Sequence, residues 1–192
     1  KTMVKILKEL IKEEIENPCE LELTEILEIF EVKTFKKGTF IKKPFTISKE
    51  IGFLIEGNLR SVVFKENGDE ITFKILEKHS FIADVVSIKT EQPTPIGFEC
   101  LNDVSVLIAP IKKFLQLLKT NLTLNILMRE HIIKITIEMG KKNLAFLKGT
   151  AKDRYQFILE NNPSLLKKFP LRLIASIIGI TPTQLSRIRN KK

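Results

Sequence analysis

The sequence predicts an α+β protein in which helices flank a β domain and an all-helical domain follows it. Two changes of period carry this expectation. Apolar residues recur at helical spacing up to about residue 31, at a period of two from Val32 to Ala109, and at helical spacing again beyond Pro110. Because the middle segment consists of short apolar stretches between turn signals, we expect a barrel or sandwich rather than a parallel sheet.

The segment from about residue 3 to 31 is expected to be helical, with a turn at Asn17–Pro18. The apolar residues at helical spacing are Val4, Leu7, Ile11 and Ile15 before the turn and Leu23, Ile26, Leu27 and Phe30 after it. Lys1–Glu16 alternates apolar and charged residues and lacks the apolar stretch of a signal peptide. We therefore expect a cytoplasmic protein.

Turn signals divide the β segment into short strands. Lys37–Gly38 and Glu56–Gly57–Asn58 are two of these signals, and Asn67–Gly68–Asp69 is a third. The third predicts a hairpin, because Asn-Gly tolerates positive φ at both central positions of a turn. The expected strands cover residues 39–41, 51–55, 59–64, 70–75 and 104–109.

After a short helix at Ile111–Leu118, the long helix expected at Asn121–Leu147 carries two apolar stripes. The first consists of Ile126, Ile133, Ile137, Gly140, Leu144 and Leu147, and the second of Met128, Ile132, Ile135 and Met139. A helix that is apolar on two sides must be buried on two sides. We expect one stripe to pack on the β domain and the other, with near-heptad spacing, on the same helix of a second copy. The alternative is a helix buried within one monomer.

The net charge of +9 is concentrated near the C-terminus. Residues 148–192 hold ten Lys or Arg against two acidic residues, a net charge of +8, whereas the rest of the chain holds 22 against 21. Such asymmetry indicates an end that binds a polyanion, with nucleic acid as the leading candidate. An anionic membrane fits less well, because the segment shows no basic amphipathic helix with exposed aromatic residues.

Residues 171–190 predict two short helices joined by a tight turn. Ala175 is placed where the helices cross, and Gly179 at the turn, where the backbone needs positive φ. Thr181 is placed to cap the second helix and Pro182 to occupy its first turn. The apolar residues expected between the helices are Ile174, Ile178, Ile180, Leu185 and Ile188. This pattern is typical of a DNA-binding helix-turn-helix; the alternative is a helical hairpin with charged ends.

The second of these helices is expected to read DNA. Its outer face presents short polar residues and arginine, which can reach base edges and phosphates in a major groove. The predicted DNA-binding residues are Thr181, Thr183, Gln184, Ser186, Arg187, Arg189, Asn190, Lys191 and Arg172. Because phosphate contacts release counterions, affinity should fall steeply with salt.

The order of these segments resembles the Crp–Fnr family of bacterial regulators. Residues 35–41 are similar to the first strand of that family's β-roll, residues 53–60 to its strand–turn–strand core, and residues 67–76 to its next hairpin. Residues 180–188 are similar to its recognition helix, in a form associated with the Bacteroidetes. Together these stretches make the resemblance more specific than any one of them.

The resemblance implies three parts: a sensor domain with a double-stranded β-helix of the jelly-roll type at 1–120, a dimerisation helix at 121–148, and a helix-turn-helix domain at 149–192. It implies a homodimeric transcription regulator that binds double-stranded DNA, with an unidentified small-molecule effector and RNA polymerase as further partners and no membrane or cofactor. The alternative is a small-molecule-binding or protein-interaction module without specific DNA recognition.

The expected effector pocket departs from the family pattern. Cyclic-nucleotide-binding members carry Phe-Gly-Glu, whose Glu takes the ribose hydroxyl, and then an Arg that neutralises the phosphate. The matching stretch here, His79–Cys100, contains no arginine, and its one lysine is outnumbered by acidic residues. We therefore expect that cyclic AMP does not bind in the usual manner. The residues expected at the pocket are Phe81, Ala83, Asp84, Thr94, Ile96 and Arg129.

Few residues are available for other chemistry. Two cysteines cannot supply an iron–sulfur cluster, and two histidines are too few for a His-rich metal site. The sequence shows no nucleophile motif and no phosphate-cradling Gly loop, so we do not expect an enzyme. For Arg60 and Arg129, the two arginines outside the C-terminal region, a surface location is the expected one.

Overall fold

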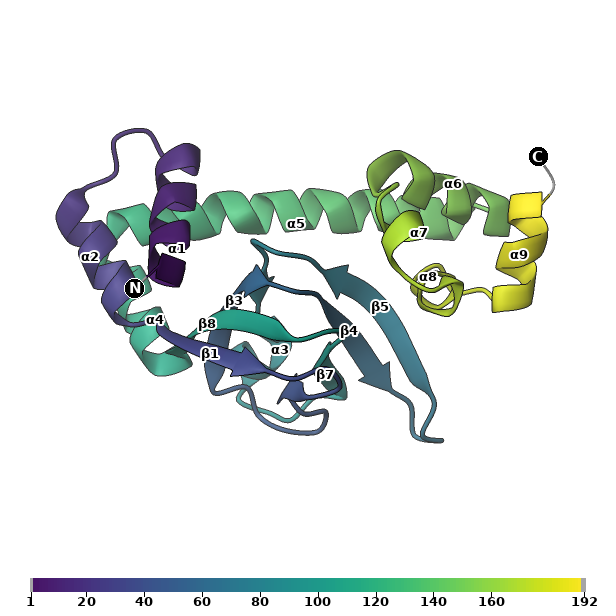
Figure 1. Ribbon diagram of the computed structural model, residues 1–192, viewed down its shortest axis with the longest axis horizontal. Helices are drawn as coiled ribbons and strands as arrows, with labels where there is room; N and C mark the ends of the chain where they lie inside the picture. Colours follow the sequence, from purple (N-terminus) through teal and green to yellow (C-terminus); the bar gives the residue numbers. More distant parts are fainter. Residues whose placement is uncertain (1, 191–192) are drawn as a thin grey trace. The chain divides into compact units, whose positions relative to one another are not determined.

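The computed structural model describes residues 2–190 and has the order of elements expected from the sequence (Figure 1). The helices are α1 (Thr2–Glu14), α2 (Glu20–Glu28), α3 (Val85–Thr90), α4 (Ile111–Thr120), α5 (Leu122–Lys148), α6 (Ala151–Asn161), α7 (Leu165–Lys168), α8 (Leu171–Ile177) and α9 (Pro182–Asn190). The strands are β1 (Glu31–Phe35), β2 (Phe40–Lys42), β3 (Glu50–Glu56), β4 (Leu59–Phe64), β5 (Glu70–Leu76), β6 (Phe81–Ile82), β7 (Ile96–Cys100) and β8 (Val104–Pro110).

The chain folds as two compact units. The first holds residues up to Glu70 together with 74–131, and the second holds residues 71–73 and those from Ile132 onward. Helix α5 contributes its first turns to one unit and the rest to the other. Among the described residues, no helix is long and apolar enough to span a membrane.

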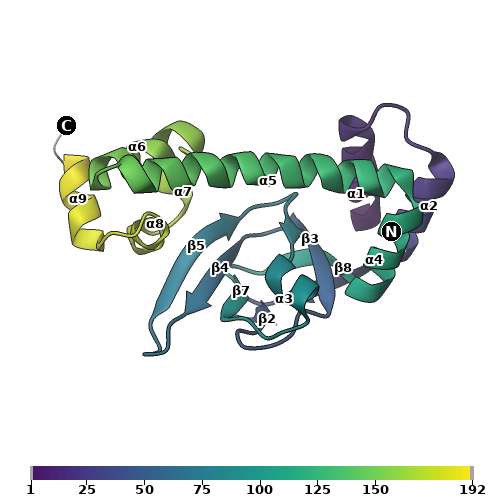
Figure 2. The same cartoon turned by 180° about the vertical axis from the view of Figure 1, so that it is seen from behind.

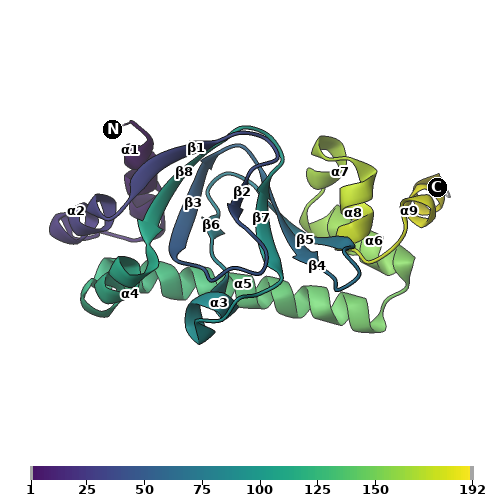
Figure 3. The ribbon, with the colours of Figure 1, turned by 90° about the horizontal axis from the view of Figure 1, so that it is seen from below.

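The β segment forms a roll of two four-stranded sheets, which enclose an interior visible in Figure 3. The strand orders are β1-β8-β3-β6 and β2-β7-β4-β5, and the registered pairs are antiparallel. The chain crosses between the sheets at every connection except β4–β5. This confirms the expected barrel or sandwich and gives it the alternation of a double-stranded β-helix.

The sheet β1-β8-β3-β6 separates two apolar cores. Leu54 and Val106 belong to the core inside the roll. Their neighbours in sequence, Phe53 and Leu107, belong to a second core with α1, α2, α4 and the first turns of α5. Side chains alternate between the two faces of a strand, and each face of β3 and β8 lies against one of these two cores. Both strands therefore appear in the sequence as continuous runs of apolar residues. Figure 2 shows α4 leading from β8 to the start of α5.

The β4–β5 hairpin forms where Asn67–Gly68 predicted it, but the expected turn type was wrong. Lys65 N–H donates to Asp69 O at 2.9 Å, so the loop contains three residues rather than two. Such a loop combines a type I turn with one left-handed residue. Gly68 supplies that residue with φ +86°, and Asn67 is not in the positive-φ region. The Asn67 side chain instead accepts a bond from Asp69 N–H at 3.1 Å.

The first turn of α5 is fixed to α2. Glu22 accepts bonds from the N–H groups of Leu122 and Thr123, each at 3.0 Å, and Asn121 Oδ1 accepts from Leu124 N–H at 2.8 Å. These are N–H groups that a helix start leaves without partners. The Thr123 hydroxyl hydrogen bond lowers the pKa of Glu22 most; burial opposes this, and the two N–H groups add to it.

Candidate DNA-binding and effector sites

Helices α8 and α9 form the expected pair of helices. Ile174, Ala175, Ile178 and Leu185 are fully buried between the elements of this unit. Ile180 N–H donates to Ala175 O at 3.0 Å, which closes the turn onto α8. The small side chain of Ala175 leaves room for this close approach, so the spacing of apolar residues did predict the local packing.

The turn between the two helices has the predicted chemistry. Gly179 adopts φ +68°, a conformation that costs other residues free energy. Thr181 caps α9, because its hydroxyl accepts from Gln184 N–H at 3.1 Å. In return, Gln184 Oε1 accepts from Thr181 N–H at 2.9 Å. This reciprocal arrangement is a capping box. Its sequence signature is a Thr followed three residues later by a Gln, and the sequence contains that spacing here.

The capping box changes the interpretation of Gln184. A glutamine reads adenine through its carbonyl oxygen and its amide together. Gln184 Oε1 accepts from Thr181 N–H at 2.9 Å and from the Thr181 hydroxyl at 3.3 Å, so both of its acceptor positions are used within the cap. Gln184 therefore positions its own helix, and its amide is the group that the cap leaves unused.

The outer face of α9 is exposed, as predicted. The exposed residues there are Thr183, Gln184, Ser186, Arg187, Arg189 and Asn190, with Thr181 before them and Arg172 on α8. Lys191 lies outside the described residues. No ion pair forms at Arg187 or Arg189 within residues 2–190, so both guanidinium groups are available to an anionic partner.

The first apolar stripe of α5 is largely uncovered in the single chain. Ile133, Ile137, Leu144 and Leu147 are 47%, 53%, 55% and 83% exposed, and a Cβ at Gly140 would meet nothing within 4 Å. Ile126, which we placed in the same stripe, is half-buried and packs on the core of its own unit.

The second stripe of α5 is only partly covered. Met128 packs on the core of the first unit, as one stripe was expected to. Ile132 and Met139, which belong to the second unit, are 57% and 59% exposed.

Three polar side chains meet inside the roll near the start of α3. The Lys42 ammonium lies 3.0 Å from Asp84 Oδ2 and donates to Thr94 Oγ1 at 3.2 Å and to Ile96 O at 2.7 Å. Asp84 also accepts from the Thr94 hydroxyl and, at 3.1 Å, from Ser87 N–H, which makes it the N-cap of α3. The side chains of Lys42 and Asp84 are 8% and 0% exposed.

Lys42 is the buried cation of this cluster. The cation comes from β2, outside the stretch that was compared with the family pattern. All three of its N–H bonds are used by protein oxygens. Burial by itself raises the pKa of Asp84, but the hydrogen bonds from Thr94 and Ser87 and the Lys42 ammonium outweigh burial and lower it. The pair is therefore charged and internally satisfied.

The other residues predicted for the effector pocket do not join this cluster as a group. Ile96 contributes its carbonyl oxygen, but Phe81 and Ala83 pack against the core on the helical side of the sheet. Arg129, which we also placed at the pocket, is 62% exposed and pairs with its neighbour Glu130 at 3.0 Å.

Arg60 is not on the surface, contrary to expectation. Its side chain is only 15% exposed and forms ion pairs with Glu99 on β7 and Glu70 on β5. Cross-strand pairing explains this, because β4 lies between those two strands and brings both carboxylates beside one guanidinium. Burial lowers the pKa of Arg60, but the two glutamates outweigh burial and the net shift is upward.

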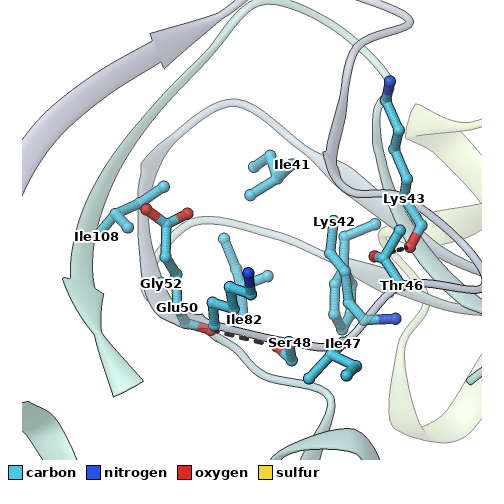
Figure 4. Close-up of a pocket in the computed structure, with 12 residues that line it drawn as sticks. Ile41, Lys42, Lys43, Thr46, Ile47, Ser48, Glu50, Gly52, Ile82 and Ile108 are labelled. Carbon is cyan, nitrogen blue, oxygen red and sulfur yellow. Dashed lines mark hydrogen bonds between the residues drawn. The ribbon is translucent and has the colours of Figure 1, made fainter. Parts of the chain in front are cut away.

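A cavity of about 400 Å³ opens at the end of the roll beside residues 41–50 (Figure 4). Ile41, Ile82 and Ile108 form its apolar wall. Lys43 points away from it, and the Glu50 carboxylate is turned inward and pairs with Lys33 at 2.9 Å. Its size lies within the range of small-molecule sites.

The described residues hold no cluster of His, Cys, Asp and Glu suited to a metal ion. Cys19 is exposed, and Cys100 is buried. Burial, with smaller contributions from Glu99 and Asp103, raises the pKa of the Cys100 thiol to about 11. A thiol with so high a pKa is an inert core residue rather than a ligand or nucleophile.

Comparison with known proteins agrees with this geometry. Residues 32–121 match the model of the cyclic nucleotide-binding domain family. FixK2 from Bradyrhizobium japonicum superposes with a TM-score of 0.70 at 14% identity, over 85% of this chain and 84% of that one. The chain has the Crp–Fnr fold. A CooA variant from Carboxydothermus hydrogenoformans gives 0.69 at 15% identity, over 86% of this chain and 77% of that one.

A Eubacterium rectale protein described as a Crp–Fnr transcriptional regulator gives a TM-score of 0.67 at 18% identity, over 90% of this chain and 82% of that one. The resemblance to the Crp–Fnr fold is thus confirmed, including its jelly-roll-type domain. No curated protein sequence matches the chain. At the cluster near α3, the Lys42 ammonium is already bonded to Asp84 and Thr94.

Proposed function

We propose that the protein is a homodimeric, sequence-specific DNA-binding transcription regulator of the Crp–Fnr type, acting in the cytoplasm. The observation that carries this proposal is the exposed polar and basic face of α9, which the Gly179 turn and the Thr181 cap hold in a helix-turn-helix. Helices presented in this way enter major grooves in DNA-binding proteins. RNA polymerase and an unidentified small-molecule effector are the further partners that such a regulator would have.

Arg187 is the residue to which we assign base recognition. It lies in the middle of α9 with its side chain exposed, and arginine contacts guanine through two parallel hydrogen bonds. Arg189, Arg172 and Lys191 are assigned to phosphates, and Thr181, Thr183, Ser186 and Asn190 to the surface that lies in the groove.

The exposed stripe of α5 is assigned to a second copy of the chain. Ile133, Ile137, Gly140 and Leu144 follow one another at steps of three and four, which is the heptad pattern of a two-helix seam. Leaving these side chains in water would cost about 25 cal/mol for each Å² of apolar surface that dimerisation could bury. A dimer would also supply two recognition helices for successive grooves about 34 Å apart.

The effector pocket of this regulator is degenerate, so cyclic AMP would not bind in the usual manner. The Lys42–Asp84 pair supports this assignment, because a phosphate would have to displace a carboxylate that is buried beside the same ammonium. Calorimetric titration with cyclic AMP should show no micromolar binding. Such binding, if lost on mutation of residues 84–94, would contradict the assignment.

Selection from a random DNA pool tests the proposed function. The protein should enrich a palindromic site, with an affinity that falls steeply as salt rises. Arg187→Ala should cost about 1–3 kcal/mol and relax preference at one base pair of each half-site, whereas the matched variant Arg189→Ala should weaken all sequences alike. If Arg187→Ala and Arg189→Ala both lowered the affinity for all sequences by the same amount, the assignment of base recognition to Arg187 would be wrong.

Gln184 needs a pair of variants because of its cap. Gln184→Glu keeps an oxygen that can accept from Thr181 N–H but removes the amide, whereas Gln184→Ala removes both. If the amide reads a base, both variants lose preference at one position. If Gln184 only caps α9, Gln184→Glu keeps the base preference and lowers affinity uniformly through its charge.

The alternative is a small-molecule-binding or protein-interaction module without specific DNA recognition. The cavity beside residues 41–50 is the observation that favours it, since its size suits a small ligand. A flat salt response and no enriched sequence in the selection would support this alternative.

A further inference from the structure

The Arg154 guanidinium lies between three helices of the second unit. Nη2 donates to Phe146 O on α5 at 3.3 Å, and Nη1 lies 3.5 Å from Ile178 O at the end of α8. The guanidinium carbon is 4.9 Å from the centre of the Phe146 ring, so the cation also stacks on that side chain. Arg154 itself belongs to α6, so one side chain contacts the ends of both neighbouring helices.

Both carbonyl groups are ones that a helix leaves without partners. Phe146 is in the last turn of α5, which ends at Lys148, and Ile178 is the C-cap of α8. The C-terminal end of a helix carries partial negative charge, so a cation shared by two such ends is favoured by both. Arginine suits this position better than lysine, because its planar group donates in two directions while it stacks.

The turn that leads to α9 rests on the same side chains. A Cβ at Gly179 would lie 3.5 Å from Arg154 Nη1 and 4.0 Å from Phe146 Cε1. One residue beyond Ile180, Thr181 begins the cap of α9. The contacts therefore run from the last turn of α5 through Arg154 to the turn that orients α9.

Stability alone does not account for this arginine. Its Nε–H is buried and finds no partner within the described part of the chain, which costs free energy that an apolar side chain would not lose. Unlike Arg187 and Arg189, which are exposed, Arg154 is half-buried and directed at helix ends.

We infer that Arg154 is a positioning residue that fixes the angle between α5 and the recognition helix α9. The consequence of this inference rests on the proposed function. When two chains pair through α5, a fixed angle between α5 and α9 sets a single distance between the two recognition helices. Each base pair added between half-sites moves the second by about 3.4 Å and turns it by roughly 35°. A rigid joint would therefore select one half-site spacing, and a loose joint would accept several.

The first test measures the joint without DNA. Spin labels on Lys134→Cys and Thr183→Cys report the distance between α5 and α9, both within the second unit, in chains diluted with unlabelled protein. Cys19→Ser removes the exposed native thiol, and the buried Cys100, with its raised pKa, should resist labelling. Arg154→Met should broaden the distance distribution about twofold, and the milder Arg154→Lys should broaden it less, because lysine keeps the charge but not the planar group. The matched variant Lys152→Met loses the same charge from an exposed site on α6 and should leave the distribution unchanged.

The second test uses duplexes selected by the wild-type protein and respaced by one base pair. Wild type and Lys152→Met should prefer the selected spacing by about tenfold or more, and Arg154→Met should reduce that preference to about threefold or less. A distance distribution in Arg154→Met as narrow as in wild type would overturn the inference. If the wild type selects no DNA, the proposed function fails, but the distance measurement still decides whether Arg154 fixes the joint.

Discussion

Lys42→Met should destabilise the β-roll strongly, because it leaves the Asp84 carboxylate buried without its cation. The Lys42 ammonium and Asp84 Oδ2 are 3.0 Å apart, and the two side chains are 8% and 0% exposed. Removing one partner of a buried pair costs about 3–5 kcal/mol. Thr94 and Ser87 N–H still bond the carboxylate, so we place the loss near the lower limit, about 3 kcal/mol. For a chain of this size, that corresponds to a fall in Tm of about 6–12 °C.

A second variant separates the unpaired charge from simple loss of packing. Asp84→Asn keeps an oxygen that can accept from Ser87 N–H but carries no charge. Lys42→Met/Asp84→Asn should therefore recover most of the loss, to within about 1 kcal/mol of the wild type. Urea unfolding followed by circular dichroism measures the free energy of unfolding, and hydrogen exchange over α3 localises the effect.

The loss in Lys42→Met should depend on pH in a defined direction. In the wild type the pKa of Asp84 is lowered, so its contribution is present above the unfolded pKa and is lost as pH falls through the folded value. Without Lys42 the buried carboxyl is expected to have a raised pKa, and protonation relieves its penalty. The difference between variant and wild type should shrink between pH 7 and pH 4. A loss below about 0.5 kcal/mol, or one that is independent of pH, would refute the reasoning.

Three further changes have definite outcomes. Glu22→Gln should lower the free energy of unfolding by about 0.5–1 kcal/mol at pH 7, and the difference should vanish as pH falls through the lowered pKa of Glu22, as measured by urea unfolding. Gly179→Ala should cost about 1–2 kcal/mol, because φ +68° is strained for alanine; an unchanged melting curve would contradict this. Ile137→Asp should shift the protein to monomer in sedimentation equilibrium, whereas Thr136→Asp, at an exposed polar position beside it, should leave the dimer intact.

The helix-turn-helix could be predicted in detail because its signals are local. The positive φ of Gly179, the cap at Thr181 and the small side chain at Ala175 all depend on residues a few positions away. The capping role of Gln184 was equally local, since it follows from a spacing of three. The type of the turn at Asn67–Gly68 could not be predicted from local signals, because it depends on how many residues β4 and β5 leave unpaired.

The buried pair in the roll could not be predicted from neighbouring residues. Lys42 and Thr94 are 52 positions apart, and only the folding of β2 against β7 brings them together. Lys42 is followed by Lys43, which is exposed, and no feature of the sequence indicates which of the two lysines is buried. The partners of Arg60 and Arg154 could not be predicted for the same reason. Strand order determines the partners of Arg60, and the positions of two helix ends determine those of Arg154, so spacing in the sequence indicates neither.

The central claim is that two copies of α9 read DNA from successive major grooves. Methylation protection of guanine N7 on a duplex selected by the protein tests it most directly, since this atom lies in the major groove. We predict two protected segments about 10 base pairs apart, both lost in Arg187→Ala. Protection of a single segment, or the same protection with Arg187→Ala as with the wild type, would contradict the claim.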